Sequence, residues 1–329
     1  MTFYIFPTAI SFIALTAIFF WGGFSALFLT VLLAILETTL SFDNAVVNAK
    51  VLNRMDARWQ RRFLTWGIPI AVFGTRFILP IFIVALAAGL GPVAVAKLAF
   101  FDAEAYSRYL EGAHTAIAAF GSAFLLLVSL KYFFNNRKKV HWIGIVERRL
   151  SRWGGIEAIE IALVLGILLV CAYFIPQEAA TLLFAGLIGV VLFIVIEGVA
   201  QSFEMEGAHA AALGGAALFV YLNILDSAFS LDGVVGAFAI TSSLPIIVVG
   251  LGIGALFVRA FTIALVRART LSTLVYLEHG AHWAIMGLAL AMLFGIFVHV
   301  PEPFTGLIGL VFVALAYVSS RREMRKVNA

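Results

Sequence analysis

The chain has 329 residues, of which 63% are hydrophobic and only 12% charged, and its mean hydropathy is +1.06. A soluble domain carries about twice that charged fraction, so the composition excludes an ordinary soluble fold. The formal net charge of +4 does not indicate nucleic-acid binding, because the basic residues lie in short segments between apolar runs. The single cysteine, Cys171, excludes a disulfide framework and a cysteine-based zinc site.

Long apolar runs follow one another along nearly the whole chain. A membrane-spanning helix needs roughly 20 mostly apolar residues. The candidate spans cover residues 3–20, 24–49, 65–90, 112–134, 157–175, 180–200, 210–239, 243–267, 275–298 and 303–320. We therefore predict an all-α, polytopic helical bundle with 9–10 transmembrane helices, folded as a single transmembrane domain over residues 1–329. The first span is the weakest, and nine spans is the alternative.

The basic residues predict the orientation of these spans. They cluster after the second, fourth and eighth spans and in the C-terminal tail, at residues 50–62, 137–152, 267–269 and 321–326. With ten spans, all four clusters fall on one side of the membrane. The positive-inside rule makes that side cytoplasmic.

A short acidic motif occurs twice. Residues 36–47 read LETTLSFDNAVV and residues 225–235 read LDSAFSLDGVV. One span after each motif comes an intramembrane arginine, and one span later a histidine in a Gly-Ala-His string. The matched positions are Glu37 and Asp226, Ser41 and Ser230, Asp43 and Asp232, Asn44 and Gly233, Arg76 and Arg259, and His114 and His282.

The two copies are offset by five spans, an odd number, so they must cross the membrane in opposite directions. This predicts an inverted internal repeat, with the first copy at about 24–134 and the second at about 210–298. Inverted repeats are a recurring plan of secondary transporters, which bind substrate near the bilayer midplane between the copies.

The repeated acidic residues are the predicted site. A carboxylate at the bilayer centre costs about 2.5–3.5 kcal/mol on insertion scales, so such groups usually face a cavity, a partner charge or an ion. Helical spacing places Glu37, Ser41, Asn44 and Asn48 on one face, and Asn223, Asp226, Ser230 and Gly233 on the corresponding face of the second copy. Asp43 and Asp232 lie off these faces, and a local unwinding of the helix there would turn them toward the same point.

Carboxylates, amides and hydroxyls are ligands that hard divalent cations such as Mg²⁺, Ca²⁺ and Mn²⁺ prefer. We predict Glu37, Asp43, Asn44, Asp226 and Asp232 as ligands, with Ser41, Ser230, Asn223, Arg76, Arg259, His114 and His282 in supporting roles. The alternative is that the acids pair with Arg76 and Arg259 as buried salt bridges. The two histidines fit either a proton relay or polar residues at span ends. No tightly bound cofactor is predicted.

Three glycines at 250, 252 and 254 imitate a nucleotide-binding fingerprint, but no strand precedes them. Inside an apolar span, close packing of helices explains them better.

The motifs ETTLSFDNAVV at 37–47 and NILDSAFSLDGVVGAFAIT at 223–241, with HGAHWAI at 279–285, resemble the TerC-like integral membrane family. The resemblance covers about residues 25–300, and the branch most similar to the chain is described only as an uncharacterised membrane domain. The resemblance implies a role in metal-ion homeostasis, notably manganese export, and in tellurite resistance.

The sequence therefore predicts a transporter that exports Mn²⁺ or a similar cation from the cytoplasmic membrane of a bacterium. Proton counter-transport is compatible with its carboxylates and histidines. The alternatives are a non-transporting membrane scaffold in metal or tellurite stress and an intramembrane metal-dependent enzyme. The enzyme is disfavoured because HExxH and GxSxG strings are absent. The lipid bilayer and the metal ion are the expected partners, nucleic acid is not, and the oligomeric state is left open.

Overall fold

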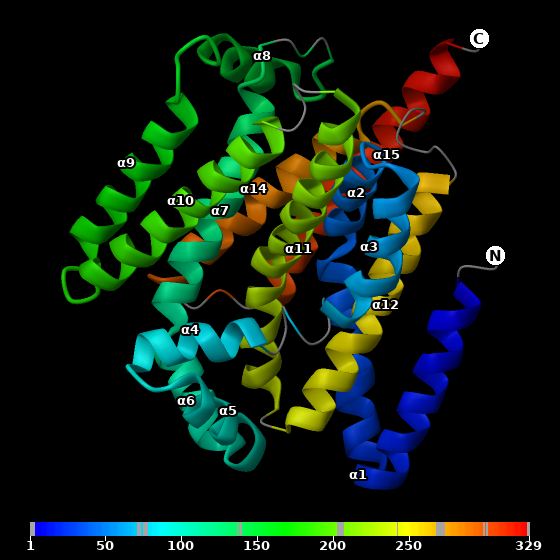
Figure 1. Ribbon diagram of the computed structural model, residues 1–329, viewed down its shortest axis with the longest axis vertical. Helices are drawn as coiled ribbons and strands as arrows, with labels where there is room; N and C mark the ends of the chain where they lie inside the picture. The colour runs from blue at the N-terminus through cyan, green and yellow to red at the C-terminus, as the bar shows by residue number, and fades with distance from the viewer. Residues whose placement is uncertain are drawn as a thin grey trace.

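A computed structural model describes residues 4–70, 74, 78–136, 138, 140–202, 207–241, 243–267, 274–298, 300 and 302–327. Every described element of regular secondary structure is a helix (Figure 1). The helices are α1 (Ile5–Leu40), α2 (Phe42–Leu52), α3 (Ala57–Pro69), α4 (Leu79–Ala88), α5 (Pro92–Phe101), α6 (Ala103–Gly112), α7 (His114–Phe133), α8 (Gly144–Trp153), α9 (Ile159–Phe174), α10 (Ala179–Ser202), α11 (Gly207–Ile240), α12 (Leu244–Arg267), α14 (Leu277–Gly295) and α15 (Glu302–Val327).

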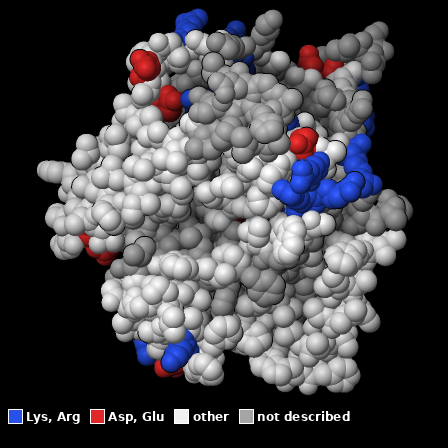
Figure 2. All heavy atoms as spheres, in the orientation of Figure 1, with Lys and Arg blue, Asp and Glu red and all other residues white. Residues whose placement is uncertain are grey.

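Several of these helices are long and apolar enough to cross a bilayer. Within the described residues they are Ile5–Thr39, His114–Phe133, Ala179–Gly198, Leu244–Arg267 and Leu277–Gly295. Large apolar side chains on the outside are highly exposed, for example Phe20 at 82%, Tyr173 at 80% and Phe184 at 71%. Figure 2 shows the charged side chains in a few separate groups, so most of the described surface on that face is uncharged. The chain is thus a polytopic helical membrane bundle, which confirms the predicted fold class.

The first helix is a hairpin. Gly23, with φ 71° and ψ −162°, interrupts α1, and Figure 1 draws two arms on either side of the bend. A positive φ is strained for residues with a side chain, so glycine is the residue suited to this turn. The bend falls between the predicted spans 3–20 and 24–49.

The second arm of α1 is interrupted again at Ser41, inside the first acidic motif. Ser41 has φ −96° and ψ 16°, and α2 starts at the next residue. The backbone N–H of Ser41 still donates to the carbonyl of Glu37 at 3.0 Å, so the helix is bent here and not fully unwound. The second motif, in contrast, lies within the continuous helix α11.

The region after α2 differs from the expected single span at 65–90. The helix α3 already starts at Ala57, because the side chain of Asp56 accepts a hydrogen bond from the backbone N–H of Trp59 at 2.8 Å and caps it. Arg58 and its basic neighbours therefore lie on a helix and not in a loop. The expected loop at 91–111 is also largely helical, as α5 and α6.

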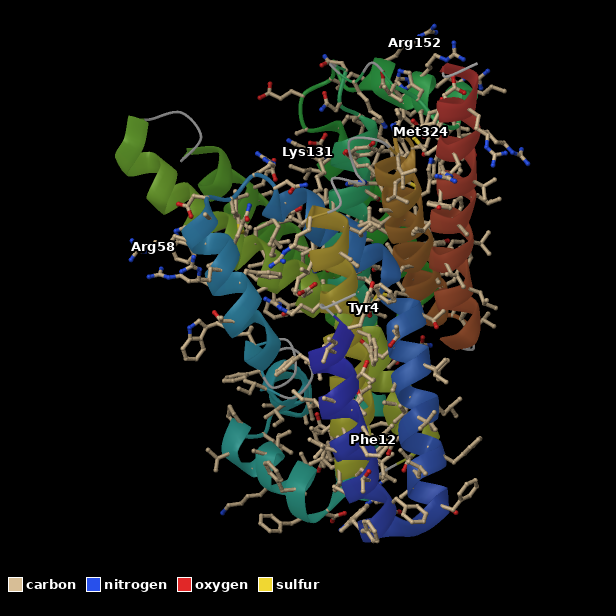
Figure 3. All side chains as sticks on the ribbon, turned by 90° about the vertical axis from the view of Figure 1, so that its right-hand side faces the viewer. Tyr4, Phe12, Arg58, Lys131, Arg152 and Met324 are labelled. Carbon is tan, nitrogen blue, oxygen red and sulfur yellow. The ribbon has the colours of Figure 1, made fainter. Side chains whose placement is uncertain are left out.

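The basic segments gather toward one end of the bundle. Figure 3 places Arg152, Met324 and Lys131 in the upper half, while Phe12, on the first arm of α1, lies in the lower half. In Figure 1 the bend of α1, the helices α5 and α6, and the turn between α11 and α12 lie at the lower end. We call the upper end, which carries α8 and the C-terminal end of α15, the basic end.

Close helix contacts hold the interior together. The second arm of α1 packs along α12, and α7 packs between α10 and α14. A Cβ atom at Gly250 would lie 2.7 Å from the Cβ of Leu33 and 3.1 Å from the carbonyl oxygen of Thr30. Real Cβ atoms do not approach so closely, so this glycine lets α12 lie against α1. The close-packing interpretation of the glycines is confirmed at this position.

Candidate functional site

The carboxylate of Glu37 is buried where α1, α11 and α12 meet. Its side chain is 2% exposed, and Oε1 accepts a hydrogen bond from the Ser41 hydroxyl at 2.9 Å. A Cβ atom at Gly233, in the second acidic motif, would lie 3.0 Å from Glu37 Oε2. A Cβ atom at Gly254 of α12 would overlap the Cβ and Cγ of Glu37. Two glycines thus make the space that this acidic side chain occupies.

A hydrogen bond joins the residue that follows the first acidic motif to the second acidic motif. Asn48 Nδ2, on α2, donates to Asp226 Oδ1, on α11, at 2.7 Å. Asn48 is 3% exposed, and its Oδ1 has no hydrogen-bond partner in the described part of the chain. A buried amide oxygen without a donor carries a desolvation penalty unless something else binds it. The pair therefore presents an unused acceptor next to a carboxylate.

Arg259 brings a positive charge to the same region. It is 8% exposed on α12, and Asp226 is close enough to act on it electrostatically. The guanidinium carbon lies 4.4 Å from the centroid of the Phe63 ring, and a Cβ atom at Gly67 would overlap the guanidinium. Its Nε and Nη2 have no hydrogen-bond partner among the described residues. The charge of Arg259 thus partly balances that of Asp226.

The structure describes some of the other predicted ligands and supporting residues and leaves others undescribed. Asn44 is 3% exposed and lies one helical turn before Asn48. The amide of Asn223 donates to the carbonyl of Phe219 in its own helix at 2.6 Å, so it is used locally. The side chains of Asp43, Ser230 and Asp232, and the whole of Arg76, lie outside the described residues. Within the described part, no three His, Cys, Asp or Glu residues form a group that could hold a metal ion.

The two predicted histidines lie in different places. His114 starts α7 and His282 lies in the first turns of α14, and Figure 1 draws these starts at opposite ends of the bundle. A Cβ atom at Gly295 would lie 3.8 Å from the Cε1 of His114. The ring of His282 stacks on Tyr132 with centroids 3.7 Å apart. The structure does not bring the two histidines together.

A second buried carboxylate, Glu147 on α8, was not found by sequence reasoning. It is 0% exposed, although it lies in the basic segment between α7 and α9. Its partners are His279 Nδ1 at 2.8 Å, Trp283 Nε1 at 3.1 Å, Lys138 Nζ at 3.3 Å, and the backbone N–H groups of residues 142 and 143 at 3.1 and 3.2 Å. Because a carboxylate only accepts, His279 Nδ1 carries the proton of its bond.

These donors set the charge state of Glu147. Burial alone raises its pKa, but the hydrogen bond and charge of His279, with the charge of Lys138, outweigh burial and hold the pKa at about 2. Burial in turn lowers the pKa of Lys138, against the opposing effect of Glu147. Glu147 is thus an ionised anchor that fixes α8 to the start of α14. The local sequence VERRLSR gives no sign of this, because it reads as a solvated charged helix.

Comparison with known proteins gives a family and no function. No curated protein and no solved structure matches the chain. Residues 42–327 match the family described as "Protein of unknown function (DUF475)". The match starts at α2, so it includes Asn48, the second acidic motif and Arg259. Since it spans most of the chain, this membrane protein belongs to the DUF475 family.

Proposed function

We propose that the protein is a secondary transporter of a divalent cation, which binds where the two acidic motifs meet. The observation that carries the proposal is the buried Asn48. Its amide nitrogen donates to Asp226, while its amide oxygen has no donor among the residues that the structure describes. A cation at this point would accept the Asn48 oxygen and an Asp226 oxygen as ligands. Hard divalent cations are bound by such oxygens.

Arg259 supports a transport cycle and not a permanent metal site. In the empty protein its charge balances that of Asp226. An arriving cation would replace that balance, and its departure would restore it. Burying a charge costs free energy. A buried charge whose partner can be exchanged nevertheless suits a transport site, because the cation must both bind there and leave.

The arrangement of the helices supports alternating access. The Asn48–Asp226 bond connects the first predicted repeat with the second, and Glu37 of the first lies against Gly233 of the second. The third helices of the two repeats, α7 and α14, pack against each other. Movement of one repeat relative to the other would open and close a site built at this junction.

The resemblance to TerC-like proteins supports Mn²⁺ as the cation, export as the direction and a bacterial cytoplasmic membrane as the location. Proton counter-transport would balance the charge. We propose no enzymatic activity. The Asp226–Arg259 interaction also supports a second candidate, a membrane scaffold in metal or tellurite stress whose buried charges serve only structure.

Flux of Mn²⁺ into proteoliposomes tests the proposal. The variants Asp226→Asn and Glu37→Gln keep the shape of each side chain and remove its charge. We expect transport to fall by at least about 10–100-fold, which is what the loss of even an outer partner costs a metal site. The matched control is Glu104→Gln, because Glu104 is exposed and pairs only across one helical turn with Arg108.

Flux above that of empty liposomes must be seen first in the unmodified protein. If the folded protein gives no flux of Mn²⁺, Mg²⁺ or Ca²⁺, the result favours the scaffold function. If flux is present and the two acidic variants transport as well as Glu104→Gln, the site is wrong.

A further inference from the structure

A half-open cavity of about 690 Å³ lies between α2, α7, α9, α10 and α11. Lys131, which Figure 3 shows in the upper half of the molecule, is part of its lining, so the cavity lies toward the basic end. Polar side chains, including Asn135 and Asn136, line it together with Val47, Leu218 and Tyr221. A cavity of this size and polarity holds many water molecules.

The charges in the lining are balanced in pairs. Lys50 forms an ion pair with Glu278, and Lys131 Nζ lies 3.6 Å from Glu160 Oε1. Arg54 and Glu197 also line the cavity, and both act electrostatically on Tyr221. The basic residues of the lining therefore have carboxylates near them and do not make an uncompensated positive patch.

Two helices of the lining continue toward the Asn48–Asp226 pair. Along the chain the lining runs from Arg54, just after α2, back to Val47 on α2, whose next neighbour is Asn48. On α11, which runs in the opposite direction in Figure 1, it runs from Leu218 to Tyr221, toward Asp226. The hydrogen bond from Asn48 Nδ2 to Asp226 Oδ1, at 2.7 Å, therefore lies one residue beyond the lining on α2 and five residues beyond it on α11.

We infer that this cavity is a water-filled vestibule through which a hydrated divalent cation reaches the Asn48–Asp226 pair from the basic end of the protein. The passage of a cation rests on the proposed function. The access of water from the basic end does not, so the two parts can fail separately.

Cysteine labelling tests access, and the chain suits it because Cys171 is its single cysteine. In a Cys171→Ser background, Leu218→Cys places a thiol in the cavity lining. Leu222→Cys is the matched control, since Leu222 is 0% exposed one helical turn further along the same helix. A charged, membrane-impermeant thiosulfonate is added to proteoliposomes of known orientation. We expect Leu218→Cys to react at least 10-fold faster than Leu222→Cys, and only from the face that carries residues 140–153.

A thiol at position 47 tests the link to the site. Modification of Val47→Cys should slow several-fold in Mn²⁺ but not in inorganic phosphate. Adding Asp226→Asn should remove the protection. Labelling of all thiols in denaturant confirms that each is present.

Three results would overturn the inference. If Leu218→Cys is unreactive, or reacts from the opposite face, the cavity is not a vestibule of the basic end, and the proposed transport can still hold by another route. If it reacts but Mn²⁺ gives no protection at position 47, the vestibule does not lead a cation to the site. Protection by phosphate alone would make the cavity an anion site.

Discussion

Two buried carboxylates, Glu147 and Asp226, show how differently this fold treats a negative charge. Glu147 accepts hydrogen bonds from His279, Trp283, Lys138 and two backbone N–H groups, and these donors are fixed by three segments of the chain. Asp226 accepts from Asn48 and faces the charge of Arg259, and the Asn48 oxygen has no donor within the described part of the chain. The first arrangement is complete and holds the structure together, whereas the second leaves an acceptor for a ligand.

The largest effect expected from this comparison is on stability. The glutamine of Glu147→Gln has only one acceptor oxygen for the five donors that surround the carboxylate. Its NH₂ group would point at some of these donors. Breaking a buried ionic cluster by removing one partner costs about 3–5 kcal/mol, so we expect the free energy of unfolding to fall by that amount. Unfolding can be followed by tryptophan fluorescence, because Trp283 is a direct partner of Glu147.

Glu104→Gln, which changes an exposed carboxylate, should leave stability unchanged within error. Equal stability of the two variants would show that Glu147 is not the anchor described above.

The same carboxylate makes stability depend on acidity. Its folded pKa of about 2 is below the ordinary value of 4.5, so the folded state binds the proton less well than the unfolded state. The stabilisation is therefore complete above about pH 4.5 and is lost as the pH falls through about 2. A difference of this size corresponds to stability on the order of 3 kcal/mol. Unfolding curves between pH 6 and 2 should show this loss, and Glu147→Gln should remove that part of the slope. An unchanged slope in the variant would assign the acid sensitivity to other groups.

The sequence predicted the helices well because membrane spans are encoded locally. Apolar length alone gives the α7 and α12 segments, and the gap between two apolar runs gives the bend at Gly23. Glu37 and Gly233, which lie close together, belong to the two copies of the acidic motif. Both copies carry charged residues inside an apolar span, and such residues are rare there.

The anchor at Glu147 could not be predicted in the same way. Its partners His279 and Trp283 are more than 130 residues away, and no sequence periodicity links a glutamate on the short helix α8 to the start of a distant helix. The start of α3 at Ala57, which Asp56 caps, is hard to predict for a different reason. The basic residues after it are typical of a loop, although an Asp followed by a helical pattern is a local capping signal.

A smaller effect should arise where Glu37 meets α12. In Gly254→Ala the new methyl group overlaps the Cβ and Cγ of Glu37. Overpacking of this kind costs about 1–3 kcal/mol, so the free energy of unfolding should fall by that amount. The control is Gly166→Ala in α9, where a Cβ atom meets nothing within 4 Å. There the gain in helix propensity should stabilise by about 0.5–1 kcal/mol. Changes of the same sign in the two variants would contradict the close approach of α12 to Glu37.

The smallest effect separates two asparagines, Asn48 and Asn223, that lie on the predicted polar faces of the two copies. Asn48→Ala removes the donor that positions Asp226, and we expect the apparent affinity for Mn²⁺ in flux assays to weaken about 10-fold. Asn223→Ala removes an amide that donates to Phe219 in its own helix, so the affinity should stay within about 2-fold. A purely structural role of Asn48 predicts instead a loss of stability with unchanged affinity in the folded fraction. Equal affinities in the two variants would place the cation away from the junction of α2 and α11. An affinity lost only in Asn48→Ala would place the cation at Asp226, the carboxylate that Asn48 positions.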